Sequence, residues 1–146
     1  MNYSGSSGFG RAYIERLAKL WGIADNDDCI SSAQAISSPP LDYVDPKRIC
    51  IRGASSGGFA VLAVLSYGRF RSTFAAGTSI AGISDLGLLA QQTHKFELHY
   101  MEKLLGGTYA NIRWIYERRS PLTHAKDIGV PLLVCFLRCG PVALIH

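Results

Sequence analysis

A serine between glycines is the residue of this chain best placed to do chemistry. Residues 49–68 read ICIRGASSGGFAVLAVLSYG, and residues 53–57 match the pattern G-x-S-x-G with Ser55 at its centre. In proteins with this pattern the serine lies on a sharp turn between a strand and a helix, which exposes its hydroxyl as a nucleophile. The apolar segments on both sides predict such a strand and helix. Ser55 is therefore the candidate nucleophile, and Ser56 is a competitor only because it is adjacent.

The backbone around this serine could stabilise a charged intermediate. We expect a helix to begin near Gly57 and to direct free N–H groups toward the serine, so that the backbone N–H of Ser56 donates to an oxyanion. Side chains at the flanking Gly53 and Gly57 are expected to collide with the neighbouring strand and helix, and Gly58 completes the glycines of the turn. The five-residue pattern is common, so it also occurs in glycine-rich turns between a strand and a helix that have no catalytic role. Such a turn is the alternative interpretation here.

Short apolar runs alternate with helical patterns along the chain, whose 146 residues suit a single domain. Strands are predicted at residues 48–53, 74–82 and 130–137. Helices are predicted at residues 11–22, 26–38, 57–67, 84–105 and 111–120. Asp25 or Asn26 is expected to cap the second of these helices, and Asn111 the last. This alternation is typical of an α/β protein with a mostly parallel sheet flanked by helices.

Composition and charge narrow the class of protein. Hydrophobic residues make up 48% of the chain and charged residues 18%, which indicates a packed globular body. The net charge of +4 comes from lysines and arginines that are spread along the sequence, so we expect no nucleic-acid partner. The N-terminus lacks the pattern of a signal peptide, and no apolar run is long enough to span a membrane. These features predict a cytoplasmic protein without a membrane partner.

Cysteine and histidine spacing gives no sign of a metal site. The four cysteines, Cys29, Cys50, Cys135 and Cys139, suggest no disulfide framework, which fits a reducing compartment. The spacing of Cys135 and Cys139 suits zinc poorly, and only His146 is near them in the sequence. We therefore expect no metal ion and no cofactor.

Four ordered segments resemble the prolyl oligopeptidase family, in particular its dipeptidyl and acylaminoacyl peptidase-like branch. They are NYSGSSGFGRAY at residues 2–13, VDPKRICIRGASSGGF at 44–59, THKFE at 93–97 and RSPLTHA at 119–125. The similarity extends to about residue 134, after which the tail at 135–146 diverges. The resemblance implies an α/β-hydrolase fold, serine peptidase chemistry and peptide substrates, with Ser55 as the nucleophile and Ser56 as a main-chain oxyanion donor.

The acid and the histidine of a catalytic triad are not identifiable. In the resembling family an acid follows the strand that matches PLLVCFL, and a histidine comes later; here the corresponding LRCGPVALIH contains neither Asp nor Glu. Asp127 and His146 follow Ser55 in the required order, but Asp127 precedes a strand and is expected at the opposite end of the sheet. Asp85 follows the second strand at the correct edge, without a histidine nearby. The histidines expected to be surface or packing residues are His94, His99 and His124.

These expectations describe the middle portion of a hydrolase domain. The family's H-G-G-P-like segment and β-propeller have no counterpart in this sequence, so we expect a partial α/β-hydrolase fold truncated at both ends. Its expected function is serine-type proteolysis of short peptides through an acyl-enzyme on Ser55, with the isolated chain inactive. The alternatives are a catalytically silent fragment that acts as an interaction module, and an esterase-like hydrolase. Neither substrate specificity nor oligomeric state follows from the sequence.

Overall fold

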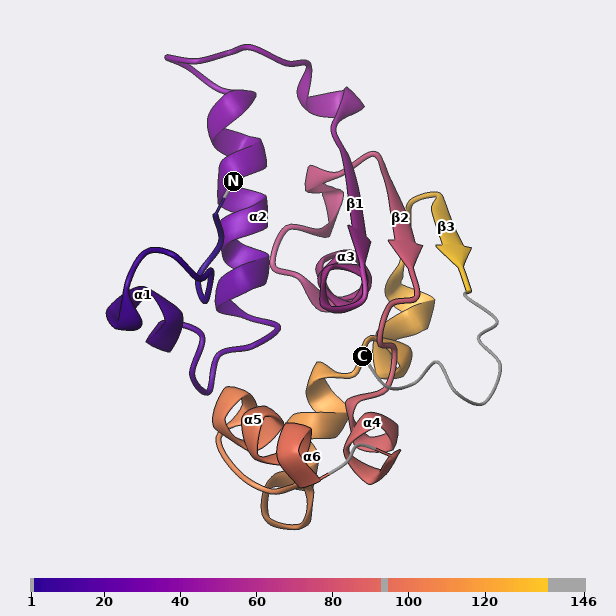
Figure 1. Ribbon diagram of the computed structural model, residues 1–146. Coiled ribbons are helices and arrows are strands. Elements are labelled where there is room, and N and C mark those ends of the chain that lie inside the picture. Colours follow the sequence, from indigo (N-terminus) through magenta and orange to yellow (C-terminus); the bar gives the residue numbers. More distant parts are fainter. Residues whose placement is uncertain (1, 93–94, 137–146) are drawn as a thin grey trace.

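Three parallel strands form the centre of the structure (Figure 1). The computed structural model describes residues 2–92 and 95–136. The strands are β1 (Cys50–Ala54), β2 (Ala76–Ile80) and β3 (Leu132–Cys135), and β2 pairs in parallel with both of the others. All three agree with the strands that the apolar runs predict. The α/β class with a mostly parallel sheet is therefore confirmed.

Helices pack around this sheet. The α-helices of the described residues are α1 (Arg11–Glu15), α2 (Ala24–Ile36), α3 (Ser56–Tyr67), α4 (Leu86–Gln92), α5 (Lys95–Leu105) and α6 (Tyr109–Arg119). Short 3-10 helices form at η1 (Pro46–Arg48), η2 (Arg71–Thr73) and η3 (Pro121–Asp127). Figure 1 shows that α2 lies to one side of the strands, whereas α4, α5 and α6 gather beyond the carboxyl ends of the strands. In the described part of the chain, no helix is long and apolar enough to cross a membrane.

Helix α3 is the packing centre of the fold. Its sequence is apolar on every side, and most of its residues are buried, as predicted. Phe59 packs on Trp21 with their rings 4.6 Å apart, in the hydrophobic cluster that α5 and α6 share. Val61 faces a second cluster with Ile30 and Phe74. Because α3 belongs to both clusters and also packs on β1 and β2, it fixes the position of the turn that precedes it.

The first helix is shorter than predicted. α1 ends at Glu15 and does not continue to residue 22, and Lys19 takes a left-handed backbone with φ 63°. The chain leaves the helix because the Lys19 N–H donates to the carbonyl of Lys103 at 3.0 Å. That carbonyl belongs to the last turn of α5, where a helix leaves its own acceptors unpaired. A tertiary contact therefore overrides the helical pattern of this segment.

Two helix caps also differ from the prediction. α2 begins before Asp25, so Asp25 and Asn26 lie in its first turn and neither is the N-cap. The Asp25 carboxylate reaches back instead to accept a hydrogen bond from the N–H of Gly22 at 2.7 Å. The N-cap of α6 is Thr108, whose hydroxyl accepts a hydrogen bond from the N–H of Asn111 at 3.3 Å. Asn111 is therefore the partner of the cap and not the cap itself.

Candidate active site

Ser55 lies in the turn between β1 and α3. β1 ends at Ala54 and α3 begins at Ser56, so one residue makes the connection. Ser55 has φ 53° and ψ −118°, a conformation that a residue with a side chain keeps only where its surroundings impose it. Its N–H donates to the carbonyl of Ile80 in β2, and its carbonyl accepts from the N–H of Phe59, both at 2.9 Å. The turn is thus held by strand and helix while Ser55 stays exposed.

Glycine is required at two of the three predicted positions around this turn. A Cβ atom on Gly53 would overlap the carbonyl group of Gly57, and one on Gly58 would lie 2.7 Å from the Cα of Gly82. Both contacts involve backbone atoms, which cannot move aside as the end of a side chain can. At Gly57 a Cβ atom would meet open space. The collision predicted there is wrong, because Gly57 lines the cavity beside Ser55.

Ser79 supports the turn, although no sequence motif marks it. It lies opposite Gly53 in the parallel register of β1 and β2 and is fully buried. Its hydroxyl donates a hydrogen bond to the carbonyl of Gly58 at 3.1 Å, which links β2 to the first turn of α3. The only signal in the sequence is the residue type, because a hydroxyl in a buried strand needs a hydrogen-bond partner.

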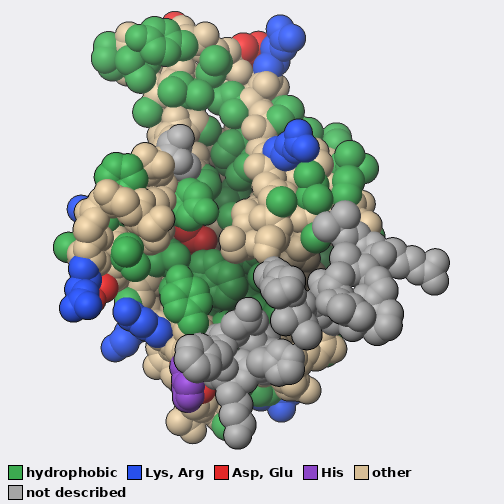
Figure 2. Space-filling model, viewed as in Figure 1, with side chains coloured by type: hydrophobic (Ala, Val, Ile, Leu, Met, Phe, Trp, Pro, Cys, Tyr) green, Lys and Arg blue, Asp and Glu red, His purple; other side chains and the backbone are tan. Residues whose placement is uncertain are grey.

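A cavity of about 600 Å³ opens beside Ser55. Its walls come from the N-terminal segment, β1 and the helices α2, α3 and α5, and they include Tyr3, Trp21, Tyr100 and Met101. Figure 2 shows a hollow whose walls are mostly hydrophobic and which has an acidic side chain inside. The sequence did not predict this cavity, because its lining residues are far apart along the chain.

Two titratable groups with raised pKa values also line the cavity. Asp25 is 4% exposed, and burial raises its pKa to about 6, although the hydrogen bond from Gly22 acts in the opposite direction. Burial, and then the neighbouring Asp25, raise the pKa of the Cys29 thiol to about 11. Since the thiolate is the reactive form, Cys29 does not compete with Ser55 as a nucleophile at neutral pH.

The candidate acids do not line this cavity. Asp85 follows β2, and its carboxylate accepts a hydrogen bond from the N–H of Leu88 at 3.0 Å, which caps the start of α4. Asp127 lies before β3, with a carboxylate oxygen 3.8 Å from Arg71 and the other 3.9 Å from His124. It is therefore at the amino end of a parallel strand, the opposite edge of the sheet from the serine.

The histidines of the described residues also lie outside the cavity. His99 is exposed on α5, with its Nδ1 atom 3.2 Å from Oε2 of Glu102. His124 lies in η3 and makes a hydrogen bond of 2.9 Å to the carbonyl of Arg118. Each makes a surface or packing contact. Three residues considered as base or metal ligand lie outside the described residues: His94, Cys139 and His146.

Several peptidases of known structure have this arrangement of strands and helices. The structure of a Mycobacterium tuberculosis puromycin-hydrolyzing peptidase matches with a TM-score of 0.82 and 44% identity, over 91% of this chain and 20% of that chain. An acylaminoacyl peptidase in complex with Z-Gly-Gly-Phe-chloromethyl ketone matches with a TM-score of 0.77 and 27% identity, over 92% of this chain and 21% of that chain. The three-stranded sheet and its helices are therefore part of an α/β-hydrolase fold, as predicted.

Within that class the chain belongs to the prolyl oligopeptidase family. A sequence model of this family matches residues 1–136. Dipeptidyl aminopeptidase BIII of Pseudoxanthomonas mexicana is 32% identical over 139 residues, which are 92% of this chain and 19% of that protein. Dipeptidyl peptidase family member 6 of Caenorhabditis elegans is 27% identical over 139 residues. The chain spans about a fifth of the length of these relatives.

Proposed function

We propose that this chain carries the nucleophile of a serine peptidase and that Ser55 is this nucleophile. The main support is an exposed serine, held at φ 53° between a strand and a helix, that lines a cavity. In the proposed reaction the Ser55 oxygen attacks the carbonyl carbon of a peptide bond while its proton passes to a general base. The tetrahedral intermediate then expels the amine, which takes up that proton, and water hydrolyses the acyl-enzyme to release the acid and restore the hydroxyl.

The first turn of α3 is the proposed binding site for the oxyanion. Ser56 is the first residue of this helix, and an N–H group in that position has no acceptor within the helix. The positive end of the helix dipole also lies there and favours a developing negative charge. A single donor of this kind accelerates acyl transfer by about 10²–10³.

Peptides are the proposed substrates. The relatives include a dipeptidyl aminopeptidase, and one similar structure holds a peptide-derived chloromethyl ketone. A cavity of about 600 Å³ is large enough for a short peptide segment, and Tyr3, Trp21 and Tyr100 give it walls suited to apolar side chains.

The isolated chain is expected to be inactive as a peptidase. Among the described residues no histidine lines the cavity, so the described part of the chain places no imidazole there to take the proton from Ser55. Loss of a triad member lowers kcat by about 10⁴–10⁶. Chemical modification is therefore a better first test than peptide turnover.

A fluorophosphonate probe tests the assignment of the nucleophile. The wild-type chain, Ser55→Ala and the adjacent control Ser56→Ala are first shown to be folded by circular dichroism and then incubated with the probe. We expect slow covalent labelling that is retained in Ser56→Ala and lost in Ser55→Ala. Labelling that persists in Ser55→Ala would refute the assignment. A folded wild-type chain that is never labelled would favour the silent interaction module.

A further inference from the structure

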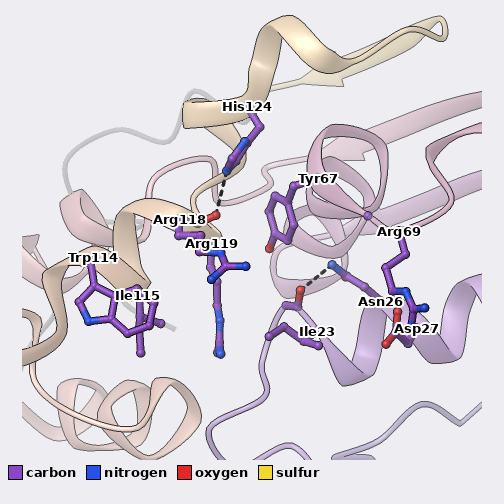
Figure 3. Close-up of a pocket in the computed structure, with 12 residues that line it drawn as sticks. Ile23, Asn26, Asp27, Tyr67, Arg69, Trp114, Ile115, Arg118, Arg119 and His124 are labelled. Atoms are coloured by element: carbon purple, nitrogen blue, oxygen red, sulfur yellow. Dashed lines mark hydrogen bonds between the residues drawn. The ribbon is translucent and has the colours of Figure 1, made fainter.

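A second cavity lies apart from the one that contains Ser55. Its volume is about 460 Å³, and it is enclosed by the start of α2, the end of α3, the second half of α6 and η3 (Figure 3). Among the described residues the two cavities have no lining residue in common. A ligand of this second cavity would therefore not touch Ser55.

The second cavity contains two buried oxygen atoms without hydrogen-bond partners. Asn26 is 3% exposed, and its Nδ2 donates to the carbonyl of Gly22 at 2.8 Å, but its Oδ1 has no partner. The hydroxyl of Tyr67 is also buried without a partner. Among the described residues these are the two buried side-chain nitrogen or oxygen atoms that lack one. Such atoms are rare in native proteins because their desolvation is costly, and both belong to residues that line this cavity.

The two oxygens offer complementary hydrogen-bonding capacity. Burial raises the pKa of Tyr67 above its ordinary value, so its hydroxyl is neutral and can donate. An amide oxygen such as Asn26 Oδ1 can only accept. The Asn26 side chain acts on Tyr67 as a hydrogen-bonding neighbour and lowers its pKa slightly, but Asn26 Oδ1 and the Tyr67 hydroxyl make no hydrogen bond of full geometry. Figure 3 shows the Tyr67 hydroxyl pointing into the space between Arg119 and Asn26. A peptide group could satisfy both oxygens, because its N–H can donate to Asn26 Oδ1 and its carbonyl can accept from the Tyr67 hydroxyl.

The charge around the cavity is mainly positive. Arg69, Arg118 and Arg119 line it, and Asp27 is its one acidic residue among those described. Arg119 is partly engaged, because its Nη1 donates to the carbonyl of Trp21 at 3.2 Å. The side chains of Arg69 and Arg118 are exposed. Figure 3 shows Arg69 beside Asp27, across the cavity from Arg118, so Arg118 is the exposed cation on the α6 side that suits a carboxylate.

An apolar wall completes the cavity. It consists of Ile23, Ile115 and Trp114, whose indole is 61% exposed. Figure 3 shows Trp114 and Ile115 together on α6, on the same side of the cavity as Arg118 and Arg119. Apolar surface beside cationic groups fits a ligand that has a hydrophobic side chain next to its carboxylate.

We propose that this second cavity binds the C-terminal residue of an N-acylated amino acid or short peptide. The peptide N–H donates to Asn26 Oδ1, and the peptide carbonyl accepts from the Tyr67 hydroxyl. The terminal carboxylate pairs with Arg118, and an apolar side chain packs on Trp114. The proposal does not depend on the role of Ser55, so either can fail without the other.

Three related compounds test the ligand chemistry on the 146-residue chain. N-acetyl-L-phenylalanine has the carboxylate, the amide and the ring; N-acetyl-L-phenylalaninamide lacks the carboxylate, and 3-phenylpropionate lacks the amide. Calorimetric titration of the folded chain should show binding of the first compound about tenfold tighter than of either other compound. Equal affinity for all three compounds, no binding to the folded chain, or equally tight binding of inorganic phosphate would overturn the proposal.

Substitutions then locate the site. Tyr67→Phe removes a hydroxyl that is unpaired in the free chain, so the melting temperature should stay the same or rise while the affinity for N-acetyl-L-phenylalanine falls several-fold. Arg118→Gln should weaken binding of this compound about tenfold but leave binding of its amide unchanged. Arg48→Gln, which removes an exposed cation that lines neither cavity, is the matched control and should change the binding of neither compound. A lower melting temperature for Tyr67→Phe, or an equal effect of Arg48→Gln and Arg118→Gln, would contradict the proposal.

Discussion

Asp25 and Asn26 are neighbours in the first turn of α2, yet they line different cavities. Asp25 faces the cavity beside Ser55, and Asn26 lines the second cavity with Tyr67. The start of α2 is thus a wall shared by both cavities. Each side of this wall has a buried group whose environment is unusual: a carboxyl with a raised pKa on one side and an unpaired amide oxygen on the other.

Asp25→Asn should stabilise the folded protein at neutral pH but not at acidic pH. Because the pKa of Asp25 is raised from 3.8 to about 6, the folded protein keeps a proton that the unfolded chain releases. The stabilisation from this proton is complete below about pH 4 and is lost as the pH rises through 6. The asparagine variant should be about 2–3 kcal/mol more stable than wild type at pH 7 and similar to it near pH 4.

Urea unfolding at both pH values measures this difference. Asp42→Asn, at an exposed position, is the control and should change stability little at either pH. An Asp25→Asn effect that is the same at both pH values would show that burial of the charge is not its cause.

Alanine at Gly53 and at Gly57 should have opposite effects. At Gly53 the new methyl group overlaps the backbone carbonyl of Gly57, so we expect a loss of more than about 2 kcal/mol or no folded protein. At Gly57 the methyl group meets open space within a helix, where alanine is favoured, so stability should rise by up to about 0.5 kcal/mol. Thermal unfolding of the pair checks this contrast, and similar losses at both positions would contradict it.

Ser79→Ala should weaken the support of the turn at Ser55. The variant loses the hydrogen bond to the Gly58 carbonyl, which costs about 1 kcal/mol. If this bond positions the first turn of α3, fluorophosphonate labelling of Ser55 should also slow at a temperature where both proteins are fully folded. Thr78→Ala removes a hydroxyl from the neighbouring residue of β2 and is the control. An unchanged labelling rate in Ser79→Ala would limit its role to stability.

Ser120→Ala should destabilise the contact between α4 and α6. The Ser120 hydroxyl accepts from the N–H of Leu86 at 2.9 Å and donates to the carbonyl of Tyr116 at 2.7 Å, and all three residues are buried. Without the Ser120 hydroxyl, the Leu86 N–H stays buried and unpaired. Urea denaturation should therefore show that the free energy of unfolding falls by about 1–3 kcal/mol. Thr123→Ala removes an exposed hydroxyl that bonds a carbonyl of α6 and should cost less than about 0.5 kcal/mol. Equal losses of stability in Ser120→Ala and Thr123→Ala would show that burial does not make the Ser120 hydrogen bonds more important.

The parts of the fold that depend on local pattern could be predicted. The apolar runs before Ser55, after Phe74 and before Cys135 are strands, and the glycine-rich turn joins a strand to a helix. Gly53 is needed for the reason expected, since the contact that it avoids, with the carbonyl group of Gly57, lies within the turn. Hydrophobic periodicity and the spacing of small residues carry this information because both act over a few neighbouring residues.

The remaining features depend on contacts between distant segments. α1 stops early because Lys19 bonds to Lys103, and nothing near Lys19 in the sequence indicates that partner. The cavity beside Ser55 combines Tyr3, at the N-terminus, with Tyr100, on α5, for the same reason. The unpaired oxygens of Asn26 and Tyr67 become visible only when the packing of α2 against α3 is known.

The backbone conformation of Ser55 has a practical consequence. A residue with a side chain keeps φ 53° only while Ile80 and Phe59 hold it, so molecules in which either contact has opened relax to an ordinary turn. The rate at which a probe modifies this one hydroxyl would then rise and fall with the fraction of molecules in the native state. The same serine would report on folding equilibria in samples where spectroscopic signals overlap.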